Sequence, residues 1–435
     1  MRVLVVGSGG REHALCWALQ KTSERPLELF CAPGNAGIEQ IARCVPIRVT
    51  DNDALAGFAE QSKIDLTMVG PEGPLASGIV DHFREHGLRI VGPTQAAARL
   101  ESSKAFAKDF MQRHAIPTAR YRIVSSAEEG ATVLDAGEFG DRESPVVIKA
   151  DGLAAGKGVF VAANRAAAVD ALNELKSGVV GAAAAQNIII EEALEGREVS
   201  LLLFSDGKGF RLMPAARDHK RVGENDTGPN TGGMGSITDA TILDDSTRDR
   251  IVREVVEPTL NGCAAEGLPF QGILFVGLML PPDGPRVLEY NVRFGDPETQ
   301  AILVRLKSDL AEIFQAMTET RLSAAQVNWS DESSACVVVA SRGYPAGAET
   351  GATIRGLEQA ARGDFTTIFH SATARGANGD WLTAGGRVLG VTATGESLDM
   401  ALSRCYGAIG DIQWDGMHYR RDIGRPLEAG ALAKG

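Results

Sequence analysis

The sequence has no paired cysteines, no long apolar runs and no excess of basic residues. Its six cysteines form no CxxC pair, which is typical of reduced, buried thiols and disfavours a zinc site or a disulfide framework. The longest apolar runs, such as 274–280, are far shorter than the ~20 residues of a bilayer-spanning helix. Lys and Arg total 44 against 56 Asp and Glu, and this net charge of −12 disfavours nucleic acid or an anionic membrane as a partner.

A chain of 435 residues is too long for one hydrophobic core, because cores stop growing at about 250–300 residues. Its hydrophobic share of 44% and charged share of 23% are typical of a soluble protein that folds throughout. The apolar run at the N-terminus is too short for a secretory signal and leads directly into a glycine turn, so we expect a cytoplasmic protein. No heptad pattern is recognisable, and we expect a monomer.

Three regions of the chain differ in their pattern, and together they predict a multidomain α/β fold. Residues 1–100 alternate short β-branched runs with helical stretches, and glycine turns end the strands, which predicts a doubly wound parallel sheet. Residues 101–325 contain a small glycine-rich module at about 120–195, which we interpret as a lid, and a long polar loop between strands. Residues 326–435 contain a last set of strands and predict a closing domain.

The turn 7–10 follows the first strand and superficially suggests a dinucleotide site. Glu12 replaces the third glycine of G-x-G-x-x-G, and the next strand ends at 32–34 without the acid that would bind a ribose. A nicotinamide or flavin site is therefore weakly supported. Small residues still let a phosphate approach backbone N–H groups at a helix N-terminus. A phosphate-bearing substrate and a plain strand-to-helix turn both remain open here.

The glycine-rich segment 151–158 invites comparison with a P-loop. Its spacing is one residue too short, and Gly158 stands where Ser or Thr would bind magnesium. Three glycines and two alanines between strands instead predict a mobile flap over phosphates, flanked by Lys149 and Lys157. A β-hairpin with a flexible turn is the alternative, but it does not explain two lysines so close to the turn.

Acidic residues follow the apolar strand 188–190. Glu191 and Glu192 end this strand, and Glu198 lies on the next one. Acids at the end of a buried strand often form a plain surface turn. In a nucleotide site, however, exposed backbone at such a hinge can contact adenine, and Glu198 could accept hydrogen bonds from ribose hydroxyls.

The segment 286–300 is the most informative in the chain. Strand alternation places Val287, Glu289, Asn291 and Arg293 on one face. Glu289 and Asn291 supply the hard oxygen ligands that Mg²⁺ prefers, and Arg293 can neutralise phosphate or carboxylate oxygens. A solvated strand face is less favoured, because the adjoining turn adds further polar groups at the same edge.

Six segments in order resemble the phosphoribosylamine–glycine ligase family of the ATP-grasp superfamily. They are GSGGREHAL, GPEGPLASGIVD, GPTQAAARLESSKAFAKDFM, VVIKADGLAAGKGV, ARDHKRVGENDTGPNTGGMGS and VLEYNVRFGDPETQ. The similarity spans nearly the whole chain, and the last three segments are highly specific in combination. It implies that ATP binds between the lid and a central domain. It also implies that glycine is joined to 5-phosphoribosylamine through glycyl phosphate, giving glycinamide ribonucleotide, ADP and phosphate in de novo purine biosynthesis.

The resemblance also implies roles for individual residues. Glu289 and Asn291 match the family's ligands for Mg²⁺ or Mn²⁺, and Gly277 nearby favours a site completed by phosphates and water. The nucleotide-binding residues that it implies are Lys104, Lys149, Gly152, Gly156, Lys157, Gly158, Glu191, Ala193, Leu194 and Glu198. The substrate-binding residues that it implies are Gly9, Gly10, Arg11, Glu12, Gly34, Asn35, Pro71, Glu72, Asp218, Arg293, Gly295 and Asp296. Arg293, Lys149 and Asp218 are the candidates for catalysis.

Three alternatives remain open from the sequence. The chain could be another ATP-grasp ligase with a different acid or amine, a dehydrogenase built on the N-terminal fold, or a nucleotide sensor without enzymatic activity. ADP release that requires both glycine and phosphoribosylamine would separate the first interpretation from these.

Overall fold

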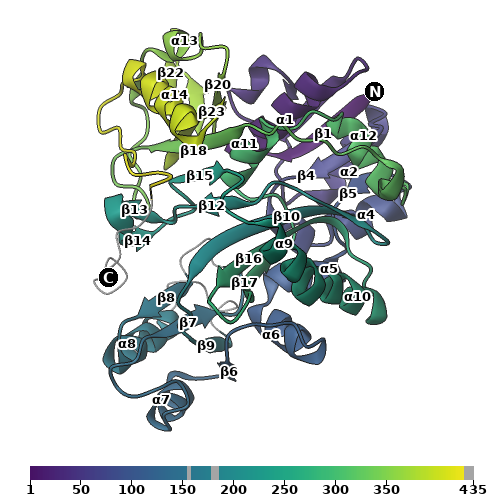
Figure 1. The fold of residues 1–435 in the computed structure, drawn as a ribbon. Helices are drawn as coiled ribbons and strands as arrows, with labels where there is room; N and C mark the ends of the chain where they lie inside the picture. The colour runs from purple at the N-terminus through teal and green to yellow at the C-terminus, as the bar shows by residue number, and fades with distance from the viewer. Residues whose placement is uncertain (154–157, 178–185, 426–435) are drawn as a thin grey trace.

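The computed structural model describes residues 1–153, 158–177 and 186–425. Figure 1 shows an N-terminal unit and a C-terminal unit side by side at one end of a large central sheet, with a small lid at the other end. Within the described residues, no helix has the length and the apolar character needed to cross a membrane.

The N-terminal unit is a parallel sheet, as the sequence predicts. The strand order is β3-β2-β1-β4-β5, and every pair in it is parallel. Its strands are β1 (Arg2–Gly7), β2 (Glu28–Pro33), β3 (Arg43–Cys44), β4 (Leu66–Val69) and β5 (Ile90–Val91). Its helical segments are α1 (Gly10–Thr22), η1 (Ile38–Gln40), α2 (Asn52–Gln61), α3 (Glu72–Ala76) and α4 (Ile79–Glu85). The strand order reverses between β1 and β4, because β2 and β3 lie on one side of β1 whereas β4 and β5 lie on the other, and ligands bind at such points.

The lid is a separate small sheet with its own core. Its strand order is β6-β9-β7-β8, with antiparallel pairs, and Figure 1 shows its two helices beside the sheet. The elements are β6 (Tyr121–Val124), α7 (Ala127–Asp135), β7 (Val146–Ala150), β8 (Val159–Ala162), α8 (Arg165–Lys176) and β9 (Ile188–Glu192). Two helices, α5 (Gln95–Ser102) and α6 (Lys104–Arg113), lead into it. Ile148, Leu172 and Ile190 are fully buried in its core.

The central sheet continues into the C-terminal region. Its order is β17-β16-β10-β12-β15-β18-β23-β20, and β11 pairs with β10. The strands are β10 (Arg197–Asp206), β11 (Phe210–Leu212), β12 (Ala216–Asp218), β15 (Gly235–Thr238), β16 (Gln271–Leu280), β17 (Arg286–Asn291), β18 (Ser333–Ala340), β20 (Thr366–His370) and β23 (Arg387–Gly395). The strands of the predicted closing domain therefore extend the central sheet, because β15 pairs with β18 across the expected boundary.

The remaining elements surround this sheet. The helical segments are η2 (Glu224–Asp226), α9 (Asp245–Ile251), η3 (Val252–Val256), α10 (Glu257–Ala265), α11 (Glu298–Leu303), α12 (Leu310–Thr318), η4 (Leu322–Ala324), α13 (Leu357–Ala360) and α14 (Leu398–Asp411). The remaining strands are β13 (Arg221–Gly223), β14 (Thr227–Asn230), β19 (Thr353–Ile354), β21 (Thr373–Arg375) and β22 (Trp381–Thr383). The hairpin β13–β14 belongs to the long polar loop of the sequence.

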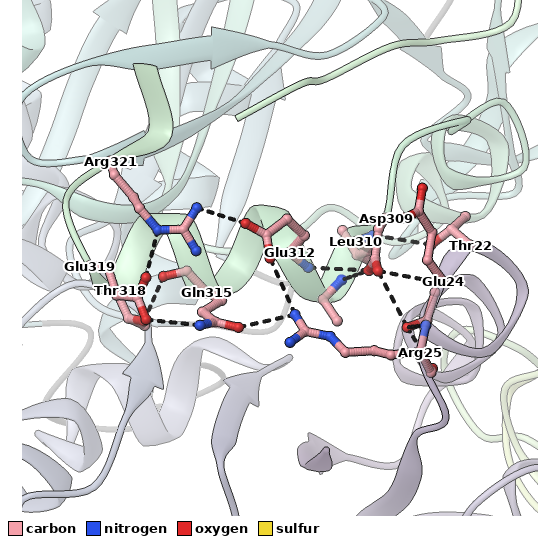
Figure 2. Close-up of polar contacts among 12 residues, drawn as sticks. Thr22, Glu24, Arg25, Asp309, Leu310, Glu312, Gln315, Thr318, Glu319 and Arg321 are labelled. Atoms are coloured by element: carbon pink, nitrogen blue, oxygen red, sulfur yellow. Dashed lines mark hydrogen bonds and ion pairs between the residues drawn. The ribbon is translucent and has the colours of Figure 1, made fainter. Parts of the chain in front are cut away.

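A polar network joins the end of α1 to α12 (Figure 2). Asp309 caps α12 by accepting the N–H groups of Ala311 and Glu312, and its other oxygen accepts the N–H of Glu24 at 3.1 Å. Arg25 donates to Glu312 at 3.2 Å and to Gln315 at 3.0 Å. Exposed pairs of this kind contribute only about 0–1 kcal/mol each. Most of the contact between the two regions is therefore apolar, because residues of β1 and of the central sheet pack in one hydrophobic core. The polar network orients α1 relative to α12.

Candidate active site

A cavity of about 500 Å³ lies between the lid, the central sheet and the N-terminal unit. We call it the central cavity. It collects side chains from segments that are far apart in sequence, from Arg11 to Arg387. The expected site residues that line it are Arg11, Pro71, Glu72, Lys104, Gly158, Glu191, Asp218, Glu289, Asn291, Arg293 and Asp296.

The other expected residues lie elsewhere. Gly156 and Lys157 fall outside the described residues, as does half of the predicted flap at 151–158. Those that are described but do not line the central cavity are Gly9, Gly10, Glu12, Gly34, Asn35, Lys149, Gly152, Ala193, Leu194, Glu198 and Gly295. Several of these adjoin a lining residue in the sequence, such as Gly10 and Glu12 beside Arg11, or pair with one, such as Lys149 with Glu191.

The face of β17 differs from the expected alternation at one position. Val287 pairs with Leu278 and Glu289 pairs with Gly277, so Leu288 between them is unpaired and forms a bulge opposite β16. The placement of Val287 beside Glu289 was therefore wrong. Val287 is fully buried in the core, while Leu288 lines the cavity. Glu289 and Asn291 still line the cavity as expected.

Glu289 lies among cations. Burial raises the pKa of this carboxyl, but Lys220, Lys149 and Lys104 outweigh burial and hold the pKa below its usual range. The Nζ atom of Lys220 is 3.9 Å from Glu289 and 3.3 Å from Glu198. Glu198 raises the pKa of Lys220 above its ordinary value. Lys220 thus joins the expected metal ligand to the expected ribose acceptor, although we had not assigned it a role.

The oxygen donors on β17 fit a divalent cation. Glu289 offers a carboxylate and Asn291 an amide oxygen, both hard ligands at the wall of a cavity wide enough for phosphates and water. Among the described residues, no group of three or more His, Cys, Asp or Glu could hold a metal ion. Gly277 lies opposite Glu289 on β16, so this neighbouring position adds no second acid. The donor set therefore suits a cation completed by non-protein ligands.

Arg293 is oriented by groups on three segments. Its Nη2 atom donates to Asn291 Oδ1 at 2.9 Å and lies 2.9 Å from Glu101 Oε1, while its Nε atom lies 3.4 Å from Glu72 Oε2. Burial lowers the pKa of Arg293, but Glu101 and Glu72 outweigh it and the net pKa lies above the usual value. Glu101 also accepts the N–H of Val292 at 2.8 Å. The guanidinium is therefore charged and fixed in direction.

Two carboxyl groups form an acidic corner of the cavity. Burial and the nearby Glu298 raise the pKa of Asp218 well above its ordinary value, and burial also raises the pKa of Glu298. Asp218 accepts the N–H of His219 at 2.7 Å. Glu298 lies at the start of α11, and its Oε1 accepts from Ser200 at 3.3 Å. This pair favours retaining a proton more strongly than exposed carboxylates do.

The turn before α1 contacts the C-terminal region. A Cβ at Gly10 would collide with the side chain of Ser371 and lie 2.8 Å from Gln300 Nε2. The space that we expected a phosphate to use at Gly10 is therefore filled by protein. Asn35 donates to the carbonyls of Ser8 at 2.7 Å and His370 at 2.9 Å, so it also joins these two regions.

Three other glycines and one acid of the expected set contact protein groups. Gly9 donates to Glu12 at 2.6 Å, and Arg11 donates to the same carboxylate at 2.6 Å. Gly34 has φ +74°, and a Cβ there would collide with a cysteine thiol. A Cβ at Gly295 would collide with Glu298.

Asp296 binds a side chain of the C-terminal region. Its Oδ2 accepts from Arg387 Nη2 at 2.9 Å, and its backbone carbonyl accepts from Arg387 Nη1 at 2.7 Å. Gln300 donates to the other carboxylate oxygen at 2.7 Å. Arg387 lines the central cavity, so the C-terminal region contributes a cation to it.

The lysine end of the cavity is lined by Lys104, Lys108 and Glu191, and Lys149 pairs with Glu191 from outside the lining. Lys104 donates to Gly152 O at 3.2 Å, and Lys149 donates to Leu288 O at 3.2 Å. Burial lowers the pKa of Lys104. Glu191 pairs with Lys149 at 3.0 Å and with Lys108, which we had not expected, at 3.0 Å.

Three family models match this chain. Models described as phosphoribosylglycinamide synthetase N domain, ATP-grasp (A) domain and C domain match residues 1–101, 102–299 and 334–426. The chain belongs to the phosphoribosylglycinamide synthetase family. The resemblance that the sequence motifs carried is confirmed, as is the architecture with a central ATP-grasp domain.

Individual members of this family are similar along nearly the whole chain. The phosphoribosylamine–glycine ligase of Xanthomonas axonopodis pv. citri is 46% identical over 427 residues, which cover 98% of this chain and 97% of the relative. The enzyme of the same name from Escherichia coli K12 is 46% identical over 431 residues and 98% of each chain. A crystal structure of phosphoribosylamine–glycine ligase from Thermotoga maritima has a TM-score of 0.82 at 31% identity, covering 97% of this chain and 100% of that chain.

Proposed function

We propose that this chain catalyses the ATP-dependent ligation of glycine to 5-phosphoribosylamine, giving glycinamide ribonucleotide, ADP and phosphate. The observation that carries the proposal is the family match along nearly the whole chain, together with one cavity that is lined by expected phosphate, metal and substrate residues, among them Lys104, Glu289 and Arg293. The high identity to relatives of that name supports these substrates over a different acid and amine.

The lysine end of the cavity suits the nucleotide. Lys104 and Lys149 would neutralise phosphates, and the backbone after Glu191, at Ala193 and Leu194, would contact adenine. Glu289 and Asn291 would hold Mg²⁺ or Mn²⁺, which when bound neutralises charge on the transferring phosphoryl group. Lys220 would then stay beside Glu198, where ribose hydroxyls are expected.

The first chemical step needs orientation more than acid–base chemistry. A carboxylate is a poor electrophile, so the glycine carboxylate attacks the γ-phosphorus of ATP, the bond to the β-phosphate oxygen breaks, and ADP leaves as glycyl phosphate forms. Arg293 would hold the carboxylate, because Glu101, Glu72 and Asn291 fix the direction of its guanidinium. Positioning and charge neutralisation of this kind supply large rate effects without a covalent intermediate on the enzyme.

In the second step, the amine of phosphoribosylamine displaces phosphate from glycyl phosphate. The amine loses a proton as the new C–N bond forms, and Asp218, which lines the cavity, would accept it. Arg11 and Glu72 of the N-terminal unit and Asp296 line the side at which we place phosphoribosylamine. We also propose that the enzyme acts as a cytoplasmic monomer on these small molecules.

A coupled assay of ADP release tests the proposal. We expect ADP release only when ATP, glycine, phosphoribosylamine and a divalent cation are all present. ADP release that is equally fast with a different acid in place of glycine would contradict the substrate assignment. Reduction of a nicotinamide by the protein would favour the dehydrogenase alternative.

A further inference from the structure

Arg420 is a buried cation that the roles above do not use. It follows the last helix, α14, and its side chain is fully buried. Its Nε and Nη2 atoms donate to the two carboxylate oxygens of Asp422 at 2.8 Å and 2.7 Å. Its Nη1 atom donates to Asp226 Oδ1 at 2.6 Å and to the carbonyl of Arg221 at 3.0 Å. A guanidinium is always charged, and burying it is costly unless it is well paired.

Two of these partners belong to the polar loop, by which we mean residues 219–232. Arg221 and Asp226 lie in and beside the hairpin β13–β14, far earlier in the sequence than Arg420. Both ends of the loop line the central cavity, with Lys220 at one end and residues 230–232 at the other. Arg420 therefore holds the part of the loop that lies between two stretches of the cavity wall.

The segment around Arg420 makes further polar contacts with the loop. We call residues 418–425 the strap. Strap and loop are also joined by the N–H of Asn225 donating to Asp422 at 2.7 Å, the N–H of Arg421 donating to Glu224 at 3.2 Å, His418 Nε2 donating to the carbonyl of Val222 at 2.9 Å, and the N–H of Gly424 donating to His219 Nε2 at 3.1 Å. The contacts thus extend along the whole strap.

The strap itself is anchored on the C-terminal region. His418 exchanges two backbone hydrogen bonds with Ala340 at the end of β18, at 2.7 Å and 2.9 Å. Tyr406 of α14 donates its hydroxyl to the carbonyl of Arg420 at 2.9 Å and accepts the N–H of Ile423 at 3.3 Å. Ile423 is buried in the core of the C-terminal region. The strap therefore offers the loop a fixed surface.

The hairpin in the loop needs such a surface. β13 and β14 form a two-stranded sheet of their own. A two-stranded hairpin is only marginally stable by itself in water, so its place depends on what it packs against. The carboxylate of Asp226 and the carbonyl of Arg221 meet one guanidinium, and this fixes both strands at once.

We propose that Arg420 is a positioning residue for the polar loop and, through the loop, for Lys220 at the wall of the central cavity. Lys220 lies between Glu198 and Glu289, so a displaced loop would take this cation away from both carboxylates. The C-terminal region would in this way control how well the cavity binds the nucleotide. The kinetic part of the inference rests on the proposed function.

The central test is Arg420→Met, which removes the charge and every donor of the side chain. We expect the backbone amides of the hairpin, that of Asn225 first, to exchange hydrogen at least about tenfold faster, while amides of β10 and β16 keep their protection. The KM for ATP and the Kd of a nonhydrolysable ATP analogue should each rise about tenfold, in line with the loss of one charged hydrogen bond. A mere loss of folded protein would lower kcat and leave both constants unchanged.

A second variant approaches the same contact from the loop. Asp226→Asn keeps the shape of the side chain, and its φ of +52° is one that Asn tolerates. It removes only one charge beside Arg420, so the KM for ATP should rise by a smaller factor. Added to Arg420→Met, it should cause no further rise. Asp226→Asn also provides the test if Arg420→Met does not fold.

Two further variants complete the set. Arg420→Lys keeps the charge but has no planar fork, so it should recover part of the ATP affinity that Arg420→Met loses. Arg362→Met is the matched control, because this exposed arginine of the C-terminal region lies outside the strap and the central cavity. It should change neither hydrogen exchange nor ATP affinity.

Three results would overturn the inference. They are unchanged exchange at Asn225 in folded Arg420→Met, faster exchange with an unchanged Kd for the ATP analogue, and losses that add in the double variant. Hydrogen exchange and analogue binding do not require the reaction. If no ADP is released with glycine and phosphoribosylamine but both measurements still depend on Arg420, the proposed reaction is wrong and the positioning role remains.

Discussion

At the scale of single residues, the metal ligand depends on its neighbours. Glu289 is surrounded by Lys220, Lys149 and Lys104, which keep it ionised. When no nucleotide is bound, these lysines have no phosphate beside them, and the Glu289 carboxylate balances part of their charge. A cation bound at Glu289 would therefore compete with Lys220 for the carboxylate, and Lys220 would pair more fully with Glu198.

We predict that Glu289→Ala lowers kcat on the order of 100-fold or more while the protein remains folded, because one hard ligand is lost from the cavity wall. Added Mg²⁺ should restore activity only in part. Initial rates over a magnesium titration, with circular dichroism as the check on folding, provide the measurement. Glu195→Ala is the control, since Glu195 is exposed and lies outside the cavity. Near-normal turnover of Glu289→Ala at limiting magnesium would refute the metal assignment.

The residues that sequence reasoning missed share one property. Glu101, Lys108, Lys220 and Arg387 act through partners that lie far away in sequence or on another strand, so neither spacing nor periodicity indicates them. The residues that it found, such as Glu289 and Asn291, stand close together on one strand. The spacing of residues along one strand shows which of them share a face. Ion pairs between distant segments can be identified only once the fold is known.

At the scale of elements, the sequence predicts the parallel sheet correctly, but it predicts less well which side chains of β17 share a face. Continuous apolar runs ending in glycine turns identify parallel strands, because these are buried on both faces. The bulge at Leu288 was not predictable, since a bulge depends on the pairing with β16 and has no fixed signal in the strand itself. For the same reason, the sequence predicts a closing domain that contains the strands at 333–340 and 387–395 but does not show that these strands pair with the central sheet.

The turn into α1 provides a prediction at this scale. Gly10→Val places a branched side chain against Ser371 and Gln300, and overpacking of this kind costs about 1–3 kcal/mol of unfolding free energy. We expect impaired use of phosphoribosylamine, because the C-terminal region is displaced, and nearly unchanged affinity for an ATP analogue. Urea unfolding and substrate titrations measure both effects.

A second substitution makes this prediction sharper. Ser371→Gly removes the side chain that a Cβ at Gly10 meets first. Combined with Gly10→Ala, which adds only that Cβ, it should recover part of the stability that Gly10→Ala loses alone. Purely additive losses would show that the two segments do not contact each other as described. A collapse of ATP affinity in Gly10→Val, with normal dependence on phosphoribosylamine, would instead place the nucleotide at the N-terminal turn.

At the scale of the whole molecule, the N-terminal and C-terminal units meet through two buried histidines. His13 Nδ1 accepts the N–H of His370 at 2.9 Å, and the two rings lie 5.5 Å apart. Trp381 packs against His370, and Phe369 packs edge-on against His13. A proton on either ring would put a charge into this contact. The interface therefore depends on both histidines staying neutral.

This contact predicts that acid weakens the folded protein. Burial, followed by the charge of His370, lowers the pKa of His13 to about 3, and burial with Arg375 lowers that of His370 to about 4. The unfolded chain binds these protons near pH 6.5, so the stability is fully present above that value and is lost as the pH falls toward 4. At pH 5 each histidine should cost about 2 kcal/mol of unfolding free energy.

Urea unfolding at pH 7 and pH 5 measures this loss, and comparison of variants isolates it from carboxyl groups that titrate in the same range. His13→Asn should be less stable at pH 7, yet it should lose less stability on acidification than the wild-type protein. His86→Asn is the control, because His86 is exposed on the N-terminal unit and should leave the pH dependence unchanged. An equal loss between pH 7 and pH 5 in His13→Asn and the wild-type protein would show that the interface is not the acid-sensitive part of the molecule.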